Sequence, residues 1–100
     1  MKHIQEYVLA IDEELEGAKE YAEKALYWKY EGNTAKYKSY NEMANDELKH
    51  VNLLHTMAVE DVAKLKEKGY TPTEKMQEVW DKSHKEYVEQ TALIRQMLAM

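Results

Sequence analysis

The sequence predicts an all-α protein made of a long antiparallel helical hairpin and a third helix. Only 3 Gly and 1 Pro interrupt its 100 residues, so breaks in secondary structure are few. Hydrophobic residues recur at spacings of three and four, which is the period of an amphipathic helix. No run of β-branched and aromatic residues alternates with polar ones, as a half-buried strand requires. The length fits one domain, residues 1–100, and no linker-like stretch divides it.

The first helix is expected over about residues 3 to 31, ending before Gly32-Asn33. One face of it is apolar, through Ile4, Val8, Ile11, Leu15, Ala18, Ala22 and Ala25.

The second helix is expected over about residues 35 to 68, with Thr34 as its N-cap and Gly69 at its C-terminal end. Its apolar stripe runs through Tyr40, Ala44, Val51, Leu54, Ala58, Val62 and Leu65. Because the connection between the first two helices is short, we expect them to form an antiparallel hairpin.

The third helix is expected over about residues 72 to 99. The stretch 71–74 (TPTE) predicts Thr71 as N-cap, Pro72 at the first helical position and Glu74 completing a capping box. Helices of about 30 residues are about 45 Å long, more than a small globule needs. Together with an amphipathic aromatic flank, this predicts a homodimer or larger homo-oligomer whose interface lies on the first two helices. The flank consists of Tyr7, Tyr21, Trp28, Tyr37 and Tyr40.

The composition argues against several classes of function. The net charge is −5 without clustered Lys and Arg, so a nucleic-acid partner is not expected. The chain has no Cys, which excludes disulfides and thiolate chemistry and fits a reducing cytoplasm. No apolar stretch is long enough to span a membrane, and the N-terminus lacks the apolar centre of a signal peptide. We therefore expect a cytoplasmic protein whose metal ligands, if any, are Glu, Asp or His.

Charged residues interrupt the apolar stripes at two places. Glu47 takes a stripe position in the second helix, and His50 follows one turn later, so the pair has a Glu-x-x-His spacing suited to metal binding. Glu14 is the charged member of the inward flank of the first helix. In a hairpin that turns near residue 33, Glu14 and Glu47 lie at similar heights. The alternative is a solvated Glu47 with His50 at the rim of the core, because such a pair occurs by chance in many helices.

Residues 12–21 (DEELEGAKEY) and 42–50 (EMANDELKH) resemble the first helix pair of ferritin-like di-iron proteins, rubrerythrins and, more closely, the short encapsulated ferritins. The resemblance covers about residues 8 to 66, whereas the third helix matches only in length and helicity. It implies that Glu14 is a single-Glu iron ligand, Glu47 a bridging carboxylate and His50 a terminal ligand. Tyr21 would then lie close to the iron ligands. These three ligands would also be the catalytic residues.

A di-iron bundle takes one Glu from each of two helices and Glu-x-x-His from each of two others, and this chain offers one of each. We therefore expect two chains to share the site in a four-helix bundle. Asp81 and His84 in the third helix are an alternative source for the missing half, although they lie at the edge of its stripe. His55 is expected to be a rim or interface residue.

The resemblance implies a ferroxidase that oxidises Fe(II) to Fe(III) with dioxygen or peroxide, in iron storage or detoxification. Short encapsulated ferritins enter an encapsulin shell through a C-terminal extension, whereas this sequence ends at Met100 in a helical pattern. A nanocompartment partner is therefore left open. Two other functions remain at this point: a metal-free helical interaction module, in which the two carboxylates neutralise Lys, and a peroxide-reducing or metal-sensing protein with the same ligands.

Overall fold

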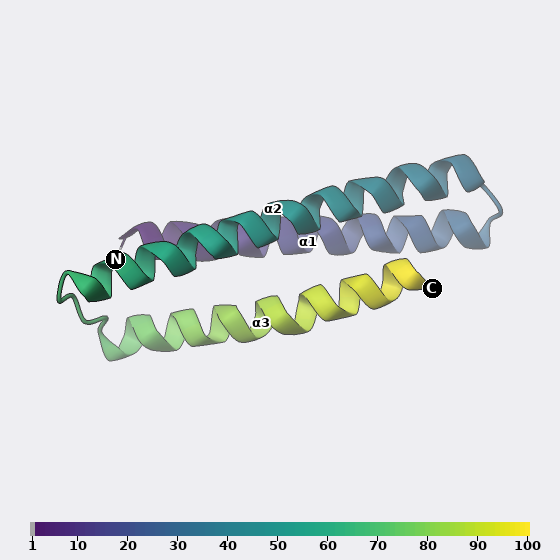
Figure 1. Ribbon diagram of the computed structural model, residues 1–100. Helices are drawn as coiled ribbons and strands as arrows, with labels where there is room; N and C mark the ends of the chain where they lie inside the picture. Colours follow the sequence, from purple (N-terminus) through teal and green to yellow (C-terminus); the bar gives the residue numbers. More distant parts are fainter. Residues whose placement is uncertain (1) are drawn as a thin grey trace.

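A computed structural model of the protein describes residues 2–100, with side chains from residue 4 onward. It contains three helices, α1 (Lys2–Tyr30), α2 (Thr34–Glu67) and α3 (Glu74–Ala99), and no strand within the described residues. The helices lie along one another in an elongated bundle of 56 × 18 × 18 Å, with α1 and α2 antiparallel and α3 parallel to α1 (Figure 1). The predicted all-α class, the hairpin and the third helix are confirmed.

Glycines in the left-handed conformation end the first two helices. Gly32 has φ +77° and Gly69 has φ +87°, which side chains with a Cβ rarely adopt. Beyond Gly32, the Asn33 N–H donates to the Trp28 carbonyl at 2.9 Å. The residue after Gly69 donates the equivalent bond to the Leu65 carbonyl at 3.0 Å. Both ends are Schellman motifs, so the reversals at these two places follow from the glycines in the sequence.

The N-cap of α2 is Asn33, and the prediction of Thr34 for this role is wrong. The Asn33 side chain accepts a hydrogen bond from the Lys36 N–H at 3.0 Å, and Thr34 is the first helical residue. Asn is at least as good an N-cap as Thr. Asn33 thus serves both helices, since its backbone closes α1 and its side chain opens α2.

The start of α3 is also displaced from the prediction. Thr73, in an extended conformation, is the N-cap, and its hydroxyl accepts a bond from the Met76 N–H at 3.2 Å. Thr71 and Pro72 therefore precede the helix, and the predicted cap at Thr71 is wrong. Pro72 and Ile4 of α1 line the same small apolar hollow.

The core lies mainly between α1 and α2, where small side chains let the two helices approach closely, and α3 covers one side through Ile94. Its buried members are Ile11, Leu15, Ala18, Ala22, Ala44, Leu48, Val51 and Ile94. On α2 the buried line passes through Leu48, which is 3% exposed, instead of through Glu47. Glu47 lies beside this line at the edge of the core, half-buried like the stripe residues Tyr40 and Leu54.

No described helix has an apolar stretch that would allow it to cross a bilayer.

Candidate metal centre

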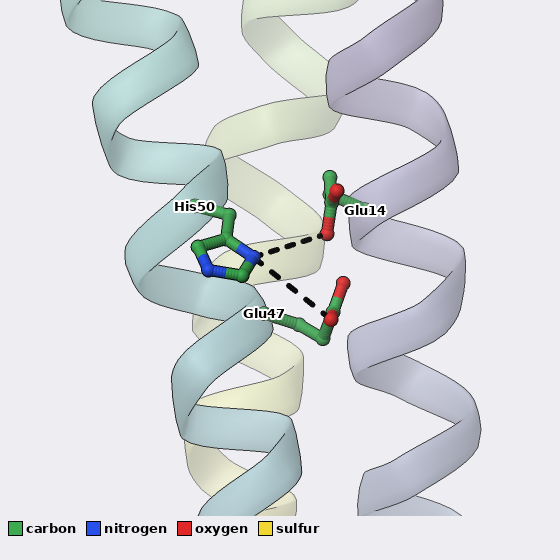
Figure 2. Close-up of side chains that lie close together, drawn as sticks. All are labelled: Glu14, Glu47 and His50. Atoms are coloured by element: carbon green, nitrogen blue, oxygen red, sulfur yellow. Dashed lines mark ion pairs between the residues drawn. The ribbon is translucent and has the colours of Figure 1, made fainter.

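Three side chains from two helices meet at the surface of the hairpin. Glu14 comes from α1 and Glu47 and His50 come from α2, and one ligand atom of each lies within 4.8 Å of the others. His50 Nδ1 is 3.5 Å from Glu14 Oε2 and 3.9 Å from Glu47 Oε1. In Figure 2 the three groups converge between α1 and α2, while α3 passes behind them. The structure thus brings together all three residues that the sequence singles out.

Helix geometry explains this convergence. Glu47 and His50 are three residues apart, so they project from neighbouring turns of α2. Across the hairpin, Gly17 follows Glu14 by one turn of α1, and the Glu47 carboxylate lies against it. A Cβ at position 17 would lie 3.4 Å from Glu47 Oε2, in ordinary van der Waals contact, so Glu47 packs closely on α1 at this point.

The electrostatics of the cluster favour a bound cation. The carboxylates are largely covered, with Glu14 32% and Glu47 25% exposed, whereas His50 is 54% exposed. Glu14 Oε2 is shielded from solvent and has no hydrogen-bond partner. A hydrogen bond with Glu14, burial and the charge of Glu14 raise the pKa of Glu47, although His50 opposes this. Two negative groups with an unsatisfied buried oxygen form an arrangement that a cation would stabilise.

The donor set suits a transition-metal ion. Carboxylate oxygens and an imidazole nitrogen are ligands for iron, zinc and manganese, and carboxylate-rich ligation fits the harder ferric state of iron. Among the described residues, no other His, Asp or Glu joins the group. Three donors from one chain leave coordination positions open, so one chain could hold one ion but supplies only half of the ligands of a di-iron centre.

Tyr21 lies two turns along α1 from Glu14, and its ring contacts Tyr40 and Lys24. Its ring stacks on Tyr40 with centroids 6.2 Å apart, and the Lys24 ammonium lies 6.0 Å from its centroid. The rings of Tyr21 and Tyr40 therefore join α1 to α2 beside the site.

Asp81 and His84 do not complete the site within one chain. Asp81 accepts a hydrogen bond from the Gln77 amide at 2.9 Å, and His84 pairs with His55 at 3.0 Å. His55 is half-buried and bridges α2 to α3. The sequence analysis missed this pair, although a signal was present: His55 and His84 are at nearly equal distances from the turn at Gly69.

Comparison of the chain with protein-family models, curated proteins and solved structures found no significant match.

Proposed function

We propose that the protein is a ferroxidase that binds Fe(II) at Glu14, Glu47 and His50 and oxidises it at a di-iron centre shared by two chains. One observation carries the proposal. A solvent-shielded carboxylate oxygen of Glu14 that accepts no hydrogen bond lies 3.5 Å from the His50 imidazole and beside a second carboxylate. Such an oxygen is costly to bury unless it is paired, and a metal ion would satisfy it.

The position of the site supports the proposal that two chains share it. It opens on the face of the hairpin away from α3 (Figure 2). Along α2 this face carries Met43, His50 and Met57 at seven-residue spacing, and both methionines are exposed, at 40% and 42%. On α1 the same spacing relates Tyr7, Glu14, Tyr21 and Trp28. A seven-residue repeat is the pattern of a helix seam that packs against further helices.

A second copy placed on this seam by a two-fold axis would bring its own Glu14, Glu47 and His50 to the first set. Such an interface pairs the same patch on both subunits, so it closes as a dimer. Two hairpins then form a four-helix bundle, with one Glu from each of two helices and Glu-x-x-His from each of the others.

The proposed reaction uses the carboxylates as electrostatic stabilisers of ferric iron. Two Fe(II) ions give up one electron each, and dioxygen takes up two electrons and two protons to leave as hydrogen peroxide. The hydrogen bond with Glu14, burial and the charge of Glu14 raise the pKa of Glu47 in the empty site, and a bound cation would lower it again. Glu47 would then bridge the two ions, with Glu14 and His50 as terminal ligands. The same ligands would also serve reduction of peroxide.

A metal-free interaction module is the second candidate, and the position of His50 favours it. When protonated, its imidazole would partly neutralise both carboxylates at 3.5 and 3.9 Å without any metal. The apolar seam would then serve only for association.

The test is an anaerobic Fe(II) titration followed by addition of oxygen, with ferric iron followed by absorbance. The wild type should bind about one iron per chain and oxidise it, and Glu14→Gln and Glu47→Gln should each lose both properties. Glu23→Gln, which removes an exposed carboxylate elsewhere on α1, is the matched control and should behave as the wild type. Absence of iron binding in the wild type would support the interaction module instead.

A further inference from the structure

A pair of histidines connects α2 to α3 on a different part of the molecule. His55 Nε2 and His84 Nδ1 are 3.0 Å apart, and the centroids of the two rings are 5.2 Å apart. A neutral imidazole has one donor and one acceptor nitrogen, so these two facing nitrogens share a single proton. The groups come from different helices and are brought together by the fold.

We propose that His55 and His84 form a second metal site, for a zinc-class divalent ion, separate from the carboxylate-rich centre. A Zn–N bond of about 2.0 to 2.1 Å in tetrahedral geometry places two nitrogen ligands about 3.4 Å apart. The observed 3.0 Å is within a few tenths of an ångström of this separation. An ion could therefore replace the shared proton after a small movement of the rings.

The position of the His55 ring is fixed by its neighbours. Tyr87 stacks on it with centroids 4.1 Å apart and planes at 6°, and Trp80 is nearly parallel to it at 5.9 Å. Tyr87 is itself anchored, because its hydroxyl donates to Asn52 Oδ1 at 2.7 Å. A ligand held in one orientation loses little conformational freedom on binding. His84 is exposed, so it offers access to solvent and room for adjustment.

The chemistry of the pair separates it from the first site. Both donors are imidazoles, and no carboxylate of the described residues joins them in a larger ligand group. Nitrogen ligation suits zinc, copper and nickel, whereas carboxylate-rich ligation suits harder ions. Burial and the neighbouring His84 lower the pKa of His55, so this imidazole stays neutral and available near neutral pH. Water would fill the remaining positions.

A bound metal ion would also hold α3 against α2. The core contacts of α3 are mainly with α1, and the histidine pair is one of the links from α3 to α2. An ion that binds only the folded chain stabilises it by mass action, by about 2.7 kcal/mol at a concentration of 100 times Kd. Zinc should therefore raise the midpoint of thermal unfolding through this pair.

The test uses the full chain carrying Glu14→Gln and Glu47→Gln, so the first site is disabled and the outcome does not depend on the proposed ferroxidase. Isothermal titration with Zn²⁺ should show about one ion per chain. Adding His84→Gln should weaken that binding at least about tenfold and remove the zinc-dependent rise in the unfolding midpoint. Adding Glu23→Gln instead changes an exposed residue of α1 outside both sites and should change neither.

Because His84 is exposed, the His84→Gln chain should keep the helical content of its parent by circular dichroism. The proposal is overturned if the doubly substituted chain binds no Zn²⁺, or if a folded His84→Gln chain binds it equally well. Loss of binding on adding Glu23→Gln would also overturn it.

Discussion

Replacement of Glu47 by Gln should stabilise the metal-free protein while abolishing iron binding. Gln keeps the shape of the side chain and removes its charge. In the metal-free protein that charge lies beside a second carboxylate and is three-quarters covered, at 25% exposure. The ionised form of Glu47 is therefore disfavoured in the fold, as the direction of its pKa shift shows.

The magnitude follows from the separation of the two carboxylates. The ligand atoms of the cluster lie within 4.8 Å of one another, and at this outer limit two unit charges repel by about 0.9 kcal/mol in water and by about 3.5 kcal/mol at an effective dielectric constant of about 20. Because both side chains are partly exposed and His50 offsets part of the repulsion, we expect about 1 kcal/mol of stabilisation. For a chain of this size, that corresponds to a rise of about 4 to 8 °C in Tm.

The pH dependence has a defined sign. A carboxyl whose pKa is raised by folding binds protons more readily in the folded state, so its ionisation lowers stability as pH rises above the ordinary value of 4.5. The advantage of Glu47→Gln should therefore be present at about pH 7 and disappear below about pH 4.

Thermal unfolding followed by far-UV circular dichroism in EDTA measures this effect, with Glu23→Gln as the control. With Fe(II) added anaerobically, the wild type should become more stable than Glu47→Gln, because the wild type gains binding free energy and the variant does not. A metal-free Glu47→Gln protein that is no more stable than the wild type at about pH 7 would refute the electrostatic account of the site.

Three further predictions concern other parts of the molecule. Gly17→Ala should raise the stability of the metal-free protein by up to about 1 kcal/mol through helix propensity. It should leave iron binding unchanged, because the new Cβ would lie 3.4 Å from Glu47 Oε2, an ordinary van der Waals contact. Thermal unfolding and iron titration measure the two effects, and a loss of stability would contradict this packing. The pKa of His55 is lowered in the folded chain, so as pH falls the imidazole is protonated first in the unfolded chain, and stability should fall below about pH 6.5. The unfolding midpoint of His55→Gln should therefore depend less steeply on pH than that of the wild type. Equal pH dependence in the two proteins would count against this. Ile94→Ala should lower the free energy of unfolding by about 2 to 5 kcal/mol, because Ile94 is fully buried and belongs to the core. Urea denaturation measures this loss, and a loss well under about 1 kcal/mol would show that α3 does not pack as described.

The helices could be predicted closely from the sequence because glycine and proline mark their ends. Each boundary lies within about two residues of its predicted place. The capping residues were harder to predict from the sequence, because Asn33 and Thr34 are both competent N-caps, as are Thr71 and Thr73. The hydrogen bonds that decide between them, from the Lys36 N–H to Asn33 and from the Met76 N–H to Thr73, are seen only in the folded chain.

The cluster could be predicted in part. Glu14 and Glu47 were expected to be close because they lie at similar heights in an antiparallel hairpin. Glu47 and His50 were expected to be close because they are three residues apart on one helix. The depth of Glu47 could not be predicted, because Leu48 and Glu47 both fit an apolar period and the rotation of α2 about its axis decides between them. The His55–His84 pair depends on how α3 docks against the hairpin, which the apolar stripes do not determine uniquely.

Native mass spectrometry after anaerobic loading with Fe(II) tests the central claim most directly, because it reports the number of chains and of metal ions in one particle. The account predicts a species of two 11.8 kDa chains with two iron ions, or a multiple of it. The same species should be absent for Glu14→Gln and present for Glu23→Gln. Iron held by single chains would contradict the shared centre, and dimers that carry no iron would contradict the metal site itself.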